Sequence, residues 1–423
     1  MFLCLAQFFF SHIVINNIQN HKTNPKEKFS MNFTYESLHA VPVTKPGPNN
    51  ARELRTHQGI PGIERIPSGR LFATWYPGGT TECKKNYAML SVSDDDGQTW
   101  TDAVAVVDPP HPDVRAFDPT LWLAPNGQLY WFWAQGCAGE DGISGLVDEV
   151  FDGLVGVWYV ILENPNAAPE HFRFTAPRRI SNGIMLNKPT VLSDGTWALP
   201  CSLWSVKSVH RARHESLWPV YGAMMVVSED EGKSFSLRGT VDVTGIPGGP
   251  SFDEHIFLEL RDGRIVCYIR ACKGIACSIS ADRGLTWSTP ALTDLPGPGS
   301  RFFIKRLQSG RILLVTNDNS SIREKLTAFL SNDDGHTWPG KLLLDERNGV
   351  SYPDGIQTKE GNIYISYDYN RTKGGYLYLA RFTEEDILNG KIGQDSFLRR
   401  EIDHSRPVPG NFDKSIATCN PTN

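Results

Sequence analysis

The chain has 423 residues, 40% of them hydrophobic and 11% aromatic, and its formal net charge at pH 7 is −5. This many apolar residues can build a large core, which excludes disorder for most of the chain. The acidic balance offers no clustered positive surface, so we expect no nucleic-acid partner.

The N-terminal segment allows two interpretations. Residues 1–15, MFLCLAQFFFSHIVI, are apolar but too few to span a membrane comfortably, and they lack the positive start and the cleavage site of a signal peptide. A polar stretch and a second methionine, Met31, follow. Either translation starts at Met31 and the protein is cytoplasmic, or residues 1–30 are a poor export signal. We predict that residues 1–45 are a disordered or mis-started extension, and that no other segment crosses a membrane.

A hairpin pattern occurs six times in the rest of the chain. In each copy a β-rich run meets a short turn ending in glycine and continues as a second β-rich run, as in LWLAPNGQLYWFW (121–133). Glycine accepts the positive φ that tight turns require. The turn glycines are Gly69, Gly127, Gly195, Gly263, Gly310 and Gly361. Their spacing predicts one four-stranded sheet per copy. We therefore expect an all-β fold, a six-bladed β-propeller over 46–400 with a tail over 401–423, rather than two packed β-sandwiches.

An eight-residue motif occurs four times after these hairpins. Its frame, Ser-x-Asp-x-Gly-x-Ser/Thr-Trp/Phe, occupies residues 93–100, 228–235, 280–287 and 331–338. The Asp can accept hydrogen bonds from backbone amides, the Gly supplies a left-handed conformation and the aromatic residue can pack back onto the sheet. The octet is shorter than an EF-hand loop and lacks its terminal Glu, so we interpret it as a structural turn and expect no metal site.

Octets with this frame on six blades are typical of the Asp boxes of sialidases. Over roughly residues 57–385 the chain resembles the sialidase superfamily, as a divergent member. Asp boxes also occur in non-catalytic propellers, so an implied activity depends on other residues. Glu254 before the fourth hairpin and Arg270 at the end of its second strand stand where sialidases have a catalytic Glu and a carboxylate-binding Arg. Arg323 matches a further sialidase arginine, although Lys325 is close enough to take that place.

The last hairpin supplies two more matches. Tyr352 stands at the position of the sialidase nucleophile, and Asp368 stands where sialidases have a Glu that orients an arginine. A sugar with a carboxylate on its anomeric carbon repels a carboxylate nucleophile, whereas a neutral tyrosine avoids this repulsion. The resemblance implies that Glu254 takes the phenol proton while Arg270 and Arg323 hold the substrate carboxylate.

The first blade departs from the sialidase pattern. Gly59 stands where sialidases have the first arginine of a triad, and Glu82 is the acid in the loop where they have Asp. We therefore assign Glu82 as the candidate general acid. The substrate-binding candidates that can replace the missing cation are His57, Arg115, which is close to Asp118, Lys188 and the basic loop VHRARHESLW (209–218). With two triad arginines, we expect weak activity on simple sialosides and better activity on a glycoside whose acid is held differently.

The implied function is that of an exo-acting glycoside hydrolase. It would release a terminal acidic sugar, which is sialic acid or another ulosonic or uronic acid, from an acidic oligosaccharide or polysaccharide. Two alternatives remain open: a non-catalytic carbohydrate-binding propeller, and a polysaccharide lyase or His-dependent glycosidase in which His57, His214 or Tyr352 acts. We expect no metal or other cofactor, and the oligomeric state is left open.

Overall fold

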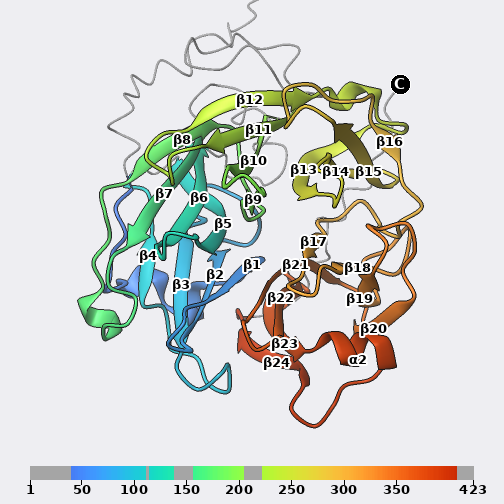
Figure 1. Ribbon diagram of the computed structural model, residues 1–423. Coiled ribbons are helices and arrows are strands. Elements are labelled where there is room, and N and C mark those ends of the chain that lie inside the picture. The colour runs from blue at the N-terminus through green and yellow to red at the C-terminus, as the bar shows by residue number, and fades with distance from the viewer. Residues whose placement is uncertain (1–39, 111–113, 138–155, 204–221, 407–423) are drawn as a thin grey trace, which may run out of the picture. The chain divides into compact units, whose positions relative to one another are not determined.

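The structure is a computed structural model that describes residues 40–110, 114–137, 156–203 and 222–406. These residues form six four-stranded antiparallel sheets, each built from one continuous segment of the chain, around a common axis (Figure 1). The predicted six-bladed β-propeller is thereby confirmed, and the two-sandwich alternative is wrong. Blade one contains β1 (Gln58–Arg65), β2 (Leu71–Pro77), β3 (Ala88–Ser93) and β4 (Ala105–Val107); blade two β5 (Val114–Leu123), β6 (Leu129–Cys137), β7 (Gly156–Leu162) and β8 (Arg178–Asn182); blade three β9 (Thr190–Val191), β10 (Trp197–Leu203), β11 (Gly222–Ser228) and β12 (Ser236–Val241). Blade four contains β13 (Pro250–Glu259), β14 (Ile265–Ala271), β15 (Gly274–Ser280) and β16 (Ala291–Leu292); blade five β17 (Phe303–Arg306), β18 (Ile312–Asn317), β19 (Leu326–Ser331) and β20 (Gly340–Asp345); blade six β21 (Val350–Gln357), β22 (Ile363–Tyr369), β23 (Tyr376–Phe382) and β24 (Phe397–Asp403).

The six predicted hairpins join the first and second strands of the blades. All six turn glycines have positive φ, between 81° and 102°. The first strand of each sheet lies nearest the axis, and β1 packs against β21 and β22, so blade six meets blade one and closes the ring (Figure 1). This arrangement gives every sheet two neighbours.

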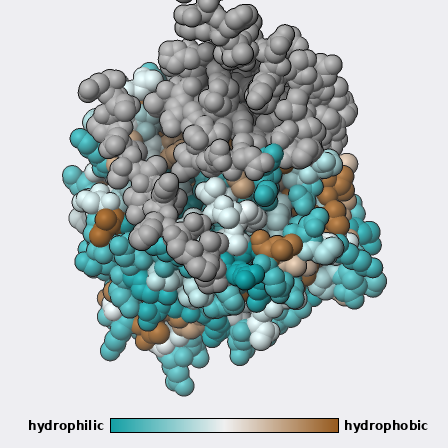
Figure 2. Space-filling model, turned by 180° about the vertical axis from the view of Figure 1, so that it is seen from behind, coloured by the Kyte–Doolittle hydropathy of each residue, from teal (hydrophilic) through white to brown (hydrophobic). Residues whose placement is uncertain are grey.

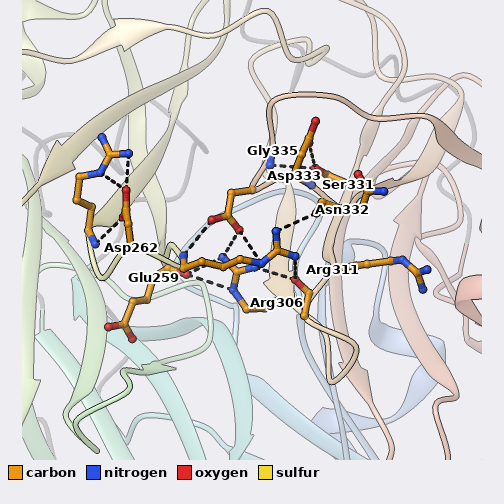
Figure 3. Close-up of polar contacts among 12 residues, drawn as sticks. Glu259, Asp262, Arg306, Arg311, Ser331, Asn332, Asp333 and Gly335 are labelled. Atoms are coloured by element: carbon orange, nitrogen blue, oxygen red, sulfur yellow. Dashed lines mark hydrogen bonds and ion pairs between the residues drawn. The ribbon is translucent and has the colours of Figure 1, made fainter.

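The four octets occupy equivalent turns between the third and fourth strands of blades one, three, four and five. In blade five, the Ser331 hydroxyl donates to Asp333 at 2.8 Å (Figure 3). Asp333 also accepts from the amide and hydroxyl of Thr337 at 2.8 and 2.6 Å. The predicted structural turn is confirmed. Blade six has the short helix α2 (Glu384–Asn389) in this place, and blade two has a 3₁₀ helix (Pro169–His171).

The cores lie between adjacent sheets. Trp122 of blade two and Trp197 of blade three, for example, meet edge to face with ring centroids 4.7 Å apart. The apolar clusters likewise combine strands from blades three and four, four and five, five and six, and six and one. Each blade therefore buries both of its faces only when its neighbours are present.

The ends of the described chain attach to blades one and six. Val43 forms a β-bridge with Val106 of β4, and β24 continues to Asp403, past the predicted boundary at residue 400. Arg55, after the 3₁₀ turns Pro48–Asn50 and Arg52–Leu54, donates to the Asp403 carboxylate at 2.7 Å. Most of the extension and tail predicted at the two ends lies outside the described residues, so those domain limits stay predictions.

Hydrophilic residues dominate the described part of one face, and apolar residues form only separate patches on it (Figure 2). Among the residues that the structure describes, no helix has the length and apolar character needed to cross a membrane.

Candidate active site

Four of the six inner strands carry a β-bulge near their start. The ladder shifts register between Gly59 and Gly62 in β1, and at the corresponding places in β5, β13 and β21. One residue in each bulge has a left-handed backbone with φ between 47° and 60°; these residues are Ile60, Asp118, Phe252 and Tyr352. This conformation is uncommon outside glycine and is often found at functional sites. Because all four bulges lie at the same end of the inner strands, they direct side chains from four blades toward one mouth of the propeller.

The hydroxyl group of Tyr352 lies between a cation and a carboxylate. Nη1 of Arg270 donates to the Tyr352 hydroxyl at 2.9 Å, and that hydroxyl donates to Oε1 of Glu254 at 3.3 Å. The same Nη1 donates to Glu254 at 2.8 Å. Burial raises the pKa of Tyr352, with Arg270 acting in the opposite direction, so the phenol is protonated at rest. A buried phenol next to a carboxylate base is the arrangement of an activated nucleophile.

Three guanidinium groups surround the ring of Tyr352. The Cζ atoms lie 4.2 Å (Arg371), 5.3 Å (Arg323) and 5.9 Å (Arg270) from the ring centroid. Burial lowers the pKa of Arg323, and the nearby charges of Arg371 and Arg270 lower it further. Its side chain lies over this ring and has no hydrogen bond or ion pair to any described residue, so its N–H donors are available to an anion.

Arg371 lies two residues after the end of β22 and contacts two carboxylates. Its Nε lies 3.2 Å from Oδ2 of Asp368, and its Nη1 lies 3.3 Å from Oε1 of Glu82. The buried Asp368 carboxylate also accepts from the Ile60 amide at 2.9 Å and from the Ser351 hydroxyl at 2.7 Å. Asp368 contacts an arginine, as predicted, but this arginine is Arg371, which we did not select from the sequence.

Two carboxyl groups beside this cluster have opposite pKa shifts. Burial acts to raise the pKa of Glu82, but the charge of Arg371 outweighs it and the pKa is lowered. Burial, together with the charges of Glu82 and Glu254, raises the pKa of Asp118 to about 7. Glu82 is therefore ionised at neutral pH, whereas Asp118 is protonated in a fraction of the protein molecules. Asp118 fits the requirements of a general acid better than Glu82 does.

Comparison with known protein families assigns the fold. Residues 69–365 match the BNR repeat-like domain, which is more than half of the chain. The chain belongs to the BNR repeat-like family. The six blades and the Asp boxes agree with this match, so the protein is a BNR propeller. No curated protein sequence is similar enough to count as a relative.

Solved structures share the fold of this BNR propeller at low sequence identity. The Hadza microbial sialidase Hz136 is 16% identical, with a TM-score of 0.62 over 78% of this chain and 66% of that sialidase. The leech intramolecular trans-sialidase is 14% identical, with a TM-score of 0.57 over 82% and 71% of the two chains. The NanB sialidase of Streptococcus pneumoniae is 13% identical, with a TM-score of 0.56 over 87% and 70%. The BNR propeller thus spans just under two thirds of Hz136.

Lys188 is a buried residue with several polar partners. Its ammonium donates to the carbonyl oxygens of Ile63 and Leu121 at 2.5 and 2.6 Å and to Glu64 at 3.1 Å, and Asp354 lies 3.4 Å away. These partners use all of its donors inside the propeller, so the contacts of Lys188 favour a structural role, and its substrate binding stays a prediction.

Three other candidates are placed by the structure. Arg115 is buried beside the site, donating to Asn86 at 2.8 Å, and both Arg115 and His57 contribute to the lowered pKa of Glu82. The exposed Lys325 lies 3.6 Å from the Glu324 carboxylate, so Arg323 is the cation that faces Tyr352. The basic loop 209–218, including His214, lies outside the described residues. Within the described ranges, no group of three His, Cys, Asp or Glu side chains is arranged to hold a metal ion.

Proposed function

We propose that this BNR propeller is an exo-acting glycoside hydrolase that releases a terminal sugar bearing a carboxylate on its anomeric carbon. The hydrogen-bonded set of Tyr352, Glu254 and Arg270, beside the free guanidinium of Arg323, carries the proposal. A cationic wall suits a carboxylate, and a neutral phenol approaches the anomeric carbon next to that carboxylate without charge repulsion.

The proposed reaction has two steps. Glu254 accepts the phenol proton while the Tyr352 oxygen bonds to the anomeric carbon, and the bond to the leaving oxygen breaks as a neighbouring acid protonates it. Water then attacks the anomeric carbon and gives its proton to the conjugate base of that acid. The bond to Tyr352 breaks, and Glu254 returns its proton to the departing phenolate oxygen. Arg270 stabilises the phenolate that forms in each step because its Nη1 already contacts the phenol oxygen.

The nucleophile can be tested with 4-methylumbelliferyl ketosides of several ulosonic acids. Tyr352→Phe should lower kcat by about 100-fold or more, with little change in KM, because the hydroxyl acts in the transition state. Tyr376→Phe is the control, since this ring stacks on Tyr378 and His404. A 3-fluoro-ulosonosyl fluoride should also leave a covalent adduct on Tyr352 that mass spectrometry can locate.

Two results would contradict this function. Full turnover by Tyr352→Phe would exclude Tyr352 as the nucleophile. Sugar binding without any turnover by the wild-type protein would favour a carbohydrate-binding propeller. A conjugated, ultraviolet-absorbing product from a uronate polysaccharide would instead identify a lyase.

A further inference from the structure

The space next to Gly59 is filled by the side chain of Arg371. A Cβ atom built on Gly59 would lie 2.1 Å from Cδ and 2.3 Å from Cγ of Arg371, and 2.9 Å from Oδ2 of Asp368. Gly59 is not among the glycines with positive φ, so its backbone conformation does not require glycine. The requirement at position 59 is therefore one of space: a side chain there and the observed Arg371 cannot coexist.

The guanidinium of Arg371 is fixed in orientation but not fully occupied. Nε is used by Asp368 and Nη1 by Glu82, while Nη2 has no hydrogen-bond partner among the described residues. Its Cζ atom lies 4.2 Å from the ring centroid of Tyr352, closer than those of the other two arginines. A guanidinium held in this way offers a pre-oriented donor to a ligand at the phenol.

We propose that Arg371 is the third carboxylate-binding arginine of the site and that the absence of a side chain at Gly59 leaves the space that Arg371 occupies. This inference rests on the proposed function and names the groups that recognise the substrate carboxylate: Arg270, Arg323 and Arg371. A guanidinium that reaches this part of the site can thus come from position 59 or from position 371, but not from both. The predicted weakness on sialosides assumed that two arginines face the substrate, whereas three guanidinium groups surround the Tyr352 ring.

Substitutions at the two positions should be interdependent. Arg371→Ala should lower kcat/KM by about 100-fold, mostly through KM, because the substrate carboxylate loses a buried charged partner. Gly59→Ala should have an effect in the same direction, since the added methyl group would displace Arg371. Gly47→Ala is the matched control, because no atom lies within 4 Å of the added Cβ there and the φ of Gly47 is not positive.

The exchange variant provides the decisive comparison. Gly59→Arg combined with Arg371→Gly should recover at least about 10-fold in kcat/KM over Arg371→Gly alone, because a guanidinium returns from the opposite side of the same space. Titration with 2,3-didehydro-N-acetylneuraminic acid and its methyl ester adds a readout that a purely structural role would not change. Wild type should prefer the acid, and Arg371→Ala, titrated at a temperature where it is fully folded, should lose most of that preference.

The outcomes separate this inference from the proposed function. If the wild type binds the acid but hydrolyses no ketoside, the proposed hydrolase function is contradicted. A loss of the acid preference in Arg371→Ala would still support Arg371 as a carboxylate-binding residue. If Arg371→Ala keeps kcat/KM and the acid preference within about threefold of wild type, the assignment is overturned. It is also overturned if Gly59→Ala behaves like Gly47→Ala.

Discussion

Two further acids of the site, Glu82 and Asp118, differ in what surrounds them. Glu82 contacts the Arg371 guanidinium, which stabilises its ionised form, whereas Asp118 is buried near two carboxylates, which stabilises its protonated form. A general acid must carry a proton when the leaving group departs. At the scale of single residues, we therefore propose Asp118 as the general acid of the proposed reaction, although the sequence favoured Glu82 because of its place in the loop.

The pH profile tests the assignment of Asp118. Since its pKa is raised to about 7, the protonated form is lost as pH rises through 7, and kcat/KM should fall on the alkaline side of that value. Asp118→Asn should remove this alkaline limb and slow sugar leaving groups by about 100-fold or more, but slow 4-methylumbelliferone less, because that group needs little protonation. Glu82→Gln is the comparison. If the alkaline limb disappears in Glu82→Gln but persists in Asp118→Asn, the general acid is Glu82.

Single residues were predictable from the sequence where they belong to a local pattern. Tyr352, Glu254 and Arg270 stand at fixed positions relative to hairpins, and the structure brings all three together. Arg371 was missed because its role depends on empty space at Gly59, far away in the sequence. The segment YDYNR (367–371) places an arginine three residues after Asp368. Only the structure shows that this arginine fills the space next to Gly59.

At the scale of elements, the octet joins neighbouring blades as well as turning the chain. Oδ2 of Asp334 in the blade-five octet accepts from the amide of Arg261 in blade four at 2.9 Å, and Arg306, shown in Figure 3, lies 2.8 Å from the same carboxylate. The octet glycine also approaches the preceding blade: a Cβ on Gly284 would lie 2.2 Å from Sδ of Met225. The octets therefore link blades as well as closing turns.

The octet aspartates make an acid-unfolding prediction. Hydrogen bonds from the octet Ser and Thr lower their pKa to about 2; the residues are Asp95, Asp230, Asp282 and Asp333. A lowered folded-state pKa stabilises the fold above the unfolded pKa, near 3.9, and this contribution is lost as pH falls toward 2. Asp333→Asn should lower the urea midpoint at pH 7 and reduce the stability lost between pH 7 and 3. The exposed Asp294→Asn should change neither, and an unaltered pH dependence in Asp333→Asn would contradict the linkage.

Hairpins and octets were predictable because glycine and Asp fix the local backbone by themselves. The bulges were not, since a left-handed Ile60 or Tyr352 is held by contacts from other blades. Their sequence signal is weak but present: a proline, which cannot donate to the ladder, follows the left-handed residue at Pro61, Pro119 and Pro353.

At the scale of the whole molecule, a buried ion-pair network crosses the inner strands. Lys188, just before β9, contacts Glu64 of β1 and Asp354 of β21, and Asp354 also contacts Arg301 at 3.3 Å. Because these groups come from different blades, the network can form only when the ring is closed. It gives the propeller an axis-centred, polar contact in addition to the apolar cores between blades.

Replacement of Lys188 tests whether it stabilises the ring or binds substrate. Lys188→Met would leave Glu64 and Asp354 buried without their shared cation, so the free energy of unfolding should fall by about 3–5 kcal/mol, while KM of the folded enzyme stays unchanged. Lys341→Met is the control: its ammonium lies 3.4 Å from Asp318 at the surface, and such a pair contributes about 0–1 kcal/mol. Urea unfolding and steady-state kinetics on the same preparations measure both quantities. An unchanged free energy of unfolding together with a raised KM would show that Lys188 binds substrate and does not stabilise the closed ring.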